Sequence, residues 1–171
     1  MPDFLSALRT VPDFPKPGIA FKDLTPVLAD PALFSALLGR LVEPWTDAGI
    51  THVVGIEARG YWLGPAIADR LGAGFVPARK PGKLPAATLR ETYDLEYGRD
   101  ALELHADDLP SAARVLVHDD VIATGGTARA ACRLVEAAGA TVAGISFAVE
   151  IAFLKGRATL PDVPIDAAIE V

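Results

Sequence analysis

The chain has 171 residues, of which 51% are hydrophobic and 22% are charged, and its formal net charge is −6. This length and composition predict one globular domain spanning residues 1–171. The acidic balance argues against general nucleic-acid binding, which depends on Lys and Arg contacts with phosphates. The uncharged runs are shorter than the roughly 20 residues of a membrane-spanning helix. Because there is one cysteine and no basic-then-apolar N-terminal segment, we expect a cytoplasmic protein without an internal disulfide.

The predicted elements alternate between helices and strands along the chain. The first clear one is a helix that begins at the N-cap and first-turn pair Asp30-Pro31 and ends or kinks at Pro44. The pattern then predicts a buried strand at 52–56, a helix at 61–71 and a second strand at 75–78. This succession is typical of a parallel sheet with connecting helices.

The regular alternation stops for about eighteen residues after Arg79, and a connection of that length usually forms a functional lid. A strand or hairpin arm is predicted at 96–105, with Leu102 and Leu104 on one face. The remaining elements are a strand at 114–118, a helix at 127–138 and a strand at 141–149. Together they predict an α/β fold with a doubly wound, mainly parallel sheet flanked by helices, whose ligands bind beyond the carboxyl ends of the strands.

The segment from Val115 to Thr127 carries the strongest functional signal. Two carboxylates, Asp119 and Asp120, follow a short apolar run, and the glycines Gly125 and Gly126 precede the predicted helix. Glycines let a backbone approach a ligand closely, and a helix start offers unpaired N–H groups to an anion. Carboxylates accept hydrogen bonds from a vicinal diol or hold a hydrated Mg²⁺. The segment therefore predicts a ligand that carries both a phosphate and a ribose.

Each half of this signal has a simpler interpretation. A Thr-Gly-Gly-Thr turn joins strands to helices in many proteins, and an acidic pair is also found in solvated loops and metal sites. The order of the two halves makes the combination more specific than either alone. Since no Lys follows the glycines, the loop is not a Walker A motif, and it does not match Gly-x-Gly-x-x-Gly either.

Residues 115–127 resemble the 5-phosphoribosyl-1-pyrophosphate (PRPP) signature of type I phosphoribosyltransferases. Four other stretches are similar, in sequence and in order, to the adenine-specific members of that family: residues 14–23, 53–61, 77–85 and 93–98. The resemblance extends from about Phe14 to Leu160.

The resemblance implies a purine salvage enzyme that transfers the 5-phosphoribosyl group of PRPP to N9 of adenine, giving AMP and pyrophosphate. It also implies the type I phosphoribosyltransferase fold, with a long flexible lid and a small hood over the base, the hood being formed by residues 14–23 and 150–153. Mg²⁺ is the implied cofactor, held mainly by substrate oxygens with no direct protein ligand. A homodimer is the implied assembly.

By the same resemblance, Glu96 and Arg59 are the catalytic residues, Glu96 as acid/base and Arg59 as pyrophosphate clamp. Asp119 and Asp120 are assigned to the ribose hydroxyls. The other residues assigned to PRPP or AMP are Ala58, Lys83, Tyr97, Ala123, Thr124, Gly125, Gly126 and Thr127. Those assigned to adenine are Ala20, Phe21, Lys22 and Ile151. A cis peptide between Ala58 and Arg59 is a further implied trait, and Lys22 departs from the Arg of many relatives.

Several alternatives remain open at this point. A phosphoribosyltransferase for another purine base would retain the PRPP loop, and a non-catalytic PRPP-binding regulator would be expected to carry a basic face or a DNA-binding domain. Without the resemblance, Phe21 is as readily a core residue, and Glu96 an ordinary exposed one. His118 is favoured as structural, and Trp45 and Trp62 as packing residues.

Overall fold

The computed structural model describes residues 3–14, 16–18, 20–94 and 98–171. Its centre is a five-stranded sheet in the order β4-β3-β7-β8-β9, in which every neighbouring pair is parallel. The strands are β3 (His52–Ile56), β4 (Gly74–Ala78), β7 (Arg114–Ile122), β8 (Thr141–Glu150) and β9 (Ile165–Glu170). The chain reverses its direction of winding between β3 and β7, and ligands bind at such a point in open α/β sheets.

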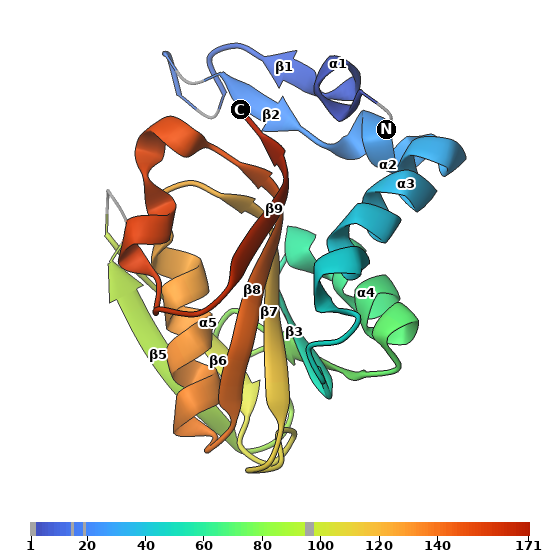
Figure 1. Ribbon diagram of the computed structural model, residues 1–171. Helices are drawn as coiled ribbons and strands as arrows, with labels where there is room; N and C mark the ends of the chain where they lie inside the picture. The colour runs from blue at the N-terminus through green and yellow to red at the C-terminus, as the bar shows by residue number, and fades with distance from the viewer. Residues whose placement is uncertain (1–2, 15, 19, 95–97) are drawn as a thin grey trace.

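Helices cover both faces of the sheet, as the alternating pattern predicted (Figure 1). Helix α5 (Gly126–Ala137) packs on one face, and α3 (Pro31–Val42) and α4 (Gly64–Leu71) pack on the other. The Asp30 carboxylate caps α3 by accepting hydrogen bonds from the N–H groups of Ala32 (2.8 Å) and Leu33 (3.0 Å), which confirms the predicted helix start. No helix in the described part of the chain is both long and apolar enough to cross a membrane.

The remaining helical elements of the described residues are short. They are α1 (Phe4–Ala7), α2 (Thr25–Ala29) and the 3₁₀ turns η1 (Glu43–Trp45), η2 (Arg59–Trp62), η3 (Ala152–Leu154) and η4 (Gly156–Thr159). The helix predicted at 61–71 is therefore divided into η2 and α4. Pro65 lies in the first turn of α4, where its missing N–H costs no hydrogen bond, and Gly64 starts that helix against the Phe75 ring. A Cβ at Gly64 would lie 2.7 Å from Cε2 of Phe75.

The segment predicted as an irregular lid is partly regular. Strand β5 (Thr88–Asp94) pairs antiparallel with β6 (Arg99–His105), and this hairpin packs beside α5 (Figure 1). Tyr93 is buried and Leu89 packs against the core, so β5 is anchored by apolar side chains. Leu102 and Leu104 are fully buried, as predicted for the second arm.

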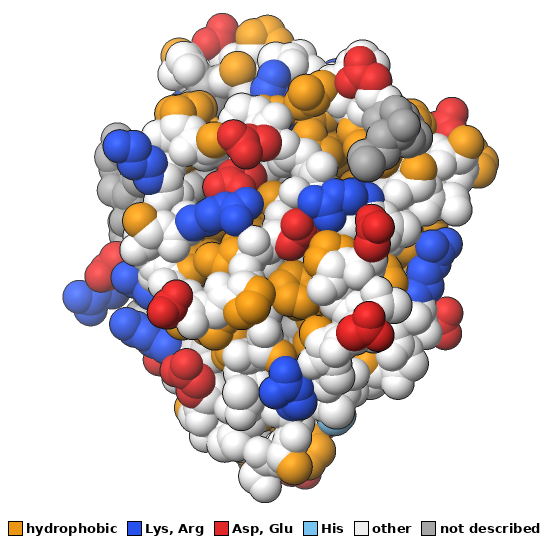
Figure 2. Space-filling model, in the orientation of Figure 1, with side chains coloured by type: hydrophobic (Ala, Val, Ile, Leu, Met, Phe, Trp, Pro, Cys, Tyr) orange, Lys and Arg blue, Asp and Glu red, His pale blue; other side chains and the backbone are white. Residues whose placement is uncertain are grey.

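Two strands, β1 (Arg9–Val11) and β2 (Phe21–Asp23), form a separate antiparallel pair above the carboxyl end of the sheet (Figure 1). The C-terminal strand β9 ends directly beneath it, and η3 follows β8 at the same end. This arrangement agrees with the expected small hood over the site. On the face shown in Figure 2, basic and acidic side chains lie next to one another, so cations are present at the surface despite the net charge of −6.

Candidate active site

The loops that follow β3, β4 and β7 meet at the carboxyl end of the sheet, below the β1–β2 pair. Arg59 lies in η2 directly after β3, and Asp119 and Asp120 lie near the end of β7. The prediction placed the two aspartates in a loop after residue 118, and this was wrong. Strand β7 continues to Ile122 because its ladder with β8 continues, pairing Asp119 with Phe147 and Ile122 with Glu150.

The two aspartates point to opposite faces of the sheet, as neighbouring residues in a strand must. Asp120 is buried, and its Oδ2 lies 2.7 Å from Nε of Arg59. Burial raises the pKa of the Asp120 carboxyl, although the charge of Arg59 opposes that rise. Burial and the adjacent Asp120 carboxylate raise the pKa of Asp119 well above its usual value. The carboxyl end of β7 therefore carries two adjacent carboxyl groups, one of them beside the Arg59 guanidinium.

A cavity of about 350 Å³ opens between Asp120 and the β1–β2 pair. Its walls are mostly apolar and combine Phe14 and Phe21 with Trp62 of η2. The Arg59 guanidinium carbon lies 5.1 Å from the centroid of the Phe21 ring, a cation–π distance. Phe21 therefore lies in the site and not in the core. Trp62 was interpreted as a packing residue, but it is 45% exposed and lines this cavity.

The phosphate-type loop forms a smaller cavity of about 90 Å³ on the other side of β7. All five predicted residues line it together with Asp119: Ala123, Thr124, Gly125, Gly126 and Thr127. Gly125 has φ +82°, a left-handed conformation that glycine adopts without steric cost, and α5 begins at the next residue. The loop thus places backbone N–H groups and the start of a twelve-residue helix around one small cavity.

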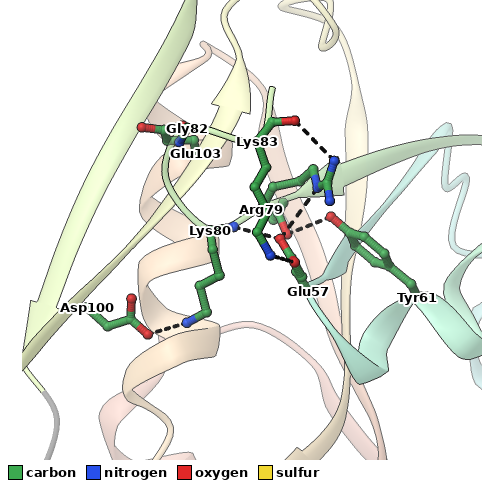
Figure 3. A network of polar contacts seen from close by, with 9 residues as sticks. Glu57, Tyr61, Arg79, Lys80, Gly82, Lys83, Asp100 and Glu103 are labelled. Atoms are coloured by element: carbon green, nitrogen blue, oxygen red, sulfur yellow. Dashed lines mark hydrogen bonds and ion pairs between the residues drawn. The ribbon is translucent and has the colours of Figure 1, made fainter. Parts of the chain in front are cut away.

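The cations after β4 converge on Glu57, a residue that the sequence did not single out (Figure 3). Its carboxylate accepts a hydrogen bond from the Lys83 ammonium and another, of 2.9 Å, from the Lys80 N–H. Nε of Arg79 lies 3.4 Å from Glu57 Oε2. Burial alone would raise the pKa of Glu57, but these hydrogen bonds and charges outweigh it and lower the pKa. Lys83 is therefore at the site edge and paired with a carboxylate.

Three of the four residues assigned to adenine lie around another cavity, of about 740 Å³, on the side of η3 and the C-terminus. They are Ala20, Lys22 and Ile151. Lys22 also lines the cavity of Phe21, and its ammonium donates a 3.0 Å hydrogen bond to Oγ1 of Thr10. Of the two assigned residues in β2, Phe21 faces Arg59 and Lys22 lines both cavities.

Two assigned residues, Glu96 and Tyr97, lie outside the described residues. The cis peptide lies one position earlier than expected, between Glu57 and Ala58. The Glu57 N–H still continues the sheet by donating to the Ala78 carbonyl at 2.8 Å, so the cis bond is the first peptide beyond that contact. Burial lowers the pKa of His118 to about 4, which agrees with the structural role favoured for it.

Comparison with known proteins gives a consistent identification. Residues 25–164 match the family model of the phosphoribosyl transferase domain. An adenine phosphoribosyltransferase of Streptomyces avermitilis is 52% identical over 98% of this chain and 94% of its own length. The crystal structure of the Rhodothermus marinus adenine phosphoribosyltransferase is 54% identical and superimposes with a TM-score of 0.94 over 98% of this chain and 96% of that one.

A relative of lower sequence identity was crystallised with ligands. The Saccharomyces cerevisiae adenine phosphoribosyltransferase, 40% identical with a TM-score of 0.92, was crystallised with adenine and an imino-altritol bisphosphate, and the match covers 97% of this chain and 96% of that one. The residues matched by the family model, 25–164, include β3, β7 and the loop 123–127. The chain therefore belongs to the phosphoribosyl transferase family, and within it to the adenine phosphoribosyltransferases.

Proposed function

We propose that the site at the carboxyl ends of β3, β4 and β7 catalyses transfer of the 5-phosphoribosyl group of PRPP to N9 of adenine, giving AMP and pyrophosphate in purine salvage. The observation that carries this proposal is the junction of two cavities at β7. Asp119 lines the small cavity of the loop 123–127, and Asp120 lines the larger cavity beside Arg59 and Phe21. A ribose that contacts both carboxylates would place its phosphate at the loop and its C1 toward the hood.

The proposed phosphate and ribose contacts follow from the donors and acceptors available. The N–H groups of the loop, with the hydroxyls of Thr124 and Thr127, would hold the 5′-phosphate. Asp119 and Asp120 would accept hydrogen bonds from the ribose 2′- and 3′-hydroxyls. Their negative charge would also favour the cationic ribosyl centre that develops as the C1–pyrophosphate bond breaks.

The proposed pyrophosphate contacts come from the residues that follow β3 and β4. Arg59 and the backbone at Ala58 would bind the leaving group, and Lys83 would add a second charge from the lid. Both cations are paired with carboxylates in the unliganded chain, Arg59 with Asp120 and Lys83 with Glu57. Pyrophosphate binding would therefore replace or share existing ion pairs.

For adenine, we propose that Phe21 packs on the ring and that the backbone of Lys22, which lines both cavities, reads its edge. Ala20 and Ile151, assigned to adenine by the resemblance, would contribute from the second cavity. Glu96 would move the proton at the adenine ring as N9 attacks, and Tyr97 would lie on the pyrophosphate side. Closure of the lid over both substrates would exclude the water that hydrolyses an activated ribose.

Mg²⁺ is proposed as the cofactor, where it would neutralise pyrophosphate charge. Among the described residues there is no cluster of three or more metal-binding side chains, and one of the two site aspartates is paired with Arg59. This donor set suits an ion held mainly by substrate oxygens. We also propose that the enzyme is a homodimer and works in the cytoplasm, in line with the family resemblance and the single buried Cys132.

A steady-state assay with PRPP, Mg²⁺ and a panel of purine bases tests the reaction. We expect turnover of adenine to AMP that is lost in excess chelator, and far weaker use of hypoxanthine and guanine. Equal or better turnover of a 6-oxopurine would favour the alternative transferase. PRPP binding without turnover of any base would favour the non-catalytic regulator, and the mass in solution tests the dimer.

A further inference from the structure

The segment after β8 packs against the back of the phosphate-type loop. Gly156 comes so close to the Ala123 carbonyl that a Cβ there would have no space, and the same Cβ would lie 2.8 Å from Cγ1 of Ile122. A Cβ at Gly125 would in turn lie 2.5 Å from the Gly156 carbonyl. The two glycines therefore bring two stretches of backbone into contact, far from each other in the sequence.

One side chain links the two stretches by a hydrogen bond. The hydroxyl of Thr159 lies 3.0 Å from the Thr124 carbonyl oxygen and 2.9 Å from that of Gly156. A threonine hydroxyl has one proton, which it shares between these two acceptors. Thr159 does not face the small cavity of the loop but lines a groove behind it with Arg129 and Cys132. The hydroxyl therefore holds the Thr124 carbonyl from behind the loop.

The direction of that carbonyl fixes the direction of the next N–H. In a trans peptide, the C=O of one residue and the N–H of the following residue point in opposite directions. The only cis peptide among the described residues joins Glu57 and Ala58, so the bond between Thr124 and Gly125 is trans. With its carbonyl held toward Thr159, this peptide turns the Gly125 N–H away from the groove and toward the cavity that Thr124 and Gly125 line.

The support is itself anchored in the sheet. Nε of Arg157 donates to both oxygens of the buried Glu150 carboxylate, at 2.9 and 2.8 Å, and Nη1 donates to the Ile165 carbonyl at 2.9 Å. Glu150 ends β8 and Ile165 begins β9. The turn that carries Thr159 is thus tied to two strands, which lets it impose a direction on the loop.

We propose that Thr159 is a positioning residue for the 5′-phosphate: it aims the Gly125 N–H at the phosphate by holding the Thr124 carbonyl. This inference rests on the phosphate role proposed above for the loop. It adds a residue that contacts no substrate and lies more than thirty positions from the motif. Because Thr159 lies outside the loop, the sequence pattern of the loop did not point to this residue.

The test compares Thr159→Val, which keeps the shape of the side chain but removes the donor, with Thr159→Ser, which keeps the donor. Binding of ribose 5-phosphate to the full chain is measured by calorimetry, alongside steady-state kinetics. For Thr159→Val we expect about a fivefold weaker affinity for ribose 5-phosphate and a similar rise in KM for PRPP, as expected for one hydrogen bond. The values of kcat and of KM for adenine should change less than twofold, because a contact held equally in ground and transition states appears in KM.

The serine variant should restore both phosphate-dependent values to within twofold of the wild type. Thr141→Val is the matched control, since Thr141 is exposed at the opposite end of β8. If Thr159→Val lowers the melting temperature too far for binding studies, Thr159→Ala removes the hydroxyl without adding a methyl group in its place.

Three outcomes would contradict the proposal. One is unchanged ribose 5-phosphate affinity in both Thr159→Val and Thr159→Ala, with normal turnover. Another is a loss shared equally by adenine and PRPP, which is what general loosening of the fold would give. The third is a wild type that binds no ribose 5-phosphate, which would remove the phosphate role of the loop and this inference with it.

Discussion

The two sides of the site, proposed to bind phosphate and pyrophosphate, are built in different ways. On the phosphate side, the loop 123–127 offers backbone N–H groups whose directions are set by glycine conformations and by packing from behind. On the pyrophosphate side, the donors are long side chains, and Arg59 and Lys83 are each paired with a carboxylate. The first region depends on backbone shape and carries little charge of its own. The second depends on charges that exchange partners, so a substitution should act through geometry in one region and through electrostatics in the other.

The difference suits the two groups that the site must bind. The 5′-phosphate stays attached to the ribose from substrate to product, so a rigid cavity of about 90 Å³ can hold it throughout. Pyrophosphate must leave, and a side chain that can return to Asp120 or Glu57 releases it more readily than a fixed backbone cradle. In the proposed mechanism, Asp120 and Glu57 would therefore be the resting partners of Arg59 and Lys83.

Asp120→Asn should have the largest effect, because Asp120 lines the cavity beside Arg59 and is paired with that guanidinium. The amide keeps the shape but removes the charge beside the developing ribosyl cation and deprives Arg59 of its partner at 2.7 Å. We expect kcat/KM for PRPP to fall by about two to three orders of magnitude. Steady-state kinetics measure the loss, and a melting curve close to that of the wild type shows that the fold is retained.

Asp30→Asn is a suitable control for this prediction, since it also exchanges a carboxylate for an amide but lies at the cap of α3, where Asn caps equally well. A near-normal kcat/KM in Asp120→Asn would show that the acidic pair is a spectator.

Gly125→Ala should have the next largest effect and tests whether the phosphate side works through geometry. A Cβ there meets the Gly156 carbonyl at 2.5 Å, and the φ of +82° costs an L-residue about 1–2 kcal/mol in addition. We expect the affinity for ribose 5-phosphate to fall by about ten- to a hundredfold while adenine binding changes little. Calorimetry with each ligand measures the two separately.

Gly72→Ala separates the two causes, because Gly72 has φ +65° but no neighbour within 4 Å of its Cβ position. That variant should lose some stability and keep its affinity. If Gly125→Ala binds ribose 5-phosphate normally, the loop adapts to the methyl group and the idea of a rigid cradle is wrong.

The difference between local patterns and contacts between distant segments explains which parts of the molecule could be predicted from the sequence. Strand β3 and the cap of α3 depend on local patterns, an apolar run and an Asp-Pro pair, and both were found where predicted. The loop 123–127 was predicted because an acidic pair, a glycine-rich turn and a helix start follow one another directly, an order more specific than either half alone. In these three cases the sequence pattern is local, and the structure agrees with it.

The failures involve contacts between distant segments. Asp119 and Asp120 were predicted in a loop because carboxylates are poor strand formers, yet pairing with β8 keeps them in β7. Strand β5 was missed because its anchors, Leu89 and Tyr93, become buried only through the packing of the hairpin against α5 and the core. Glu57 was missed because its partners come from the segment after β4, and only the pairing of β3 with β4 brings them together.

Glu57→Gln should have the smallest effect and tests the charged region at a point that contacts no substrate in the proposed mechanism. The lowered pKa of Glu57 means that its charged form stabilises the fold. For a carboxyl with a lowered pKa, this stabilisation is present above the unfolded value of about 4.3 and is lost as the pH falls through the folded value. We therefore expect Glu57→Gln to lower the free energy of unfolding by about 1–2 kcal/mol at pH 7, a typical loss for charged hydrogen bonds.

The difference between Glu57→Gln and the wild type should begin to shrink as the pH falls below about 4.3, because the Glu57 carboxyl of the unfolded chain then binds a proton while the folded one resists it. Urea unfolding at pH 7 and pH 3.5 measures both differences, and Glu136→Gln, on the exposed side of α5, is the control. Released from Glu57, Lys83 should also become available to pyrophosphate, so KM for PRPP should stay the same or fall by up to about threefold. A large rise in that KM would instead mean that Glu57 holds Lys83 in its binding position, and the resting-partner account of the pyrophosphate side would have to be abandoned.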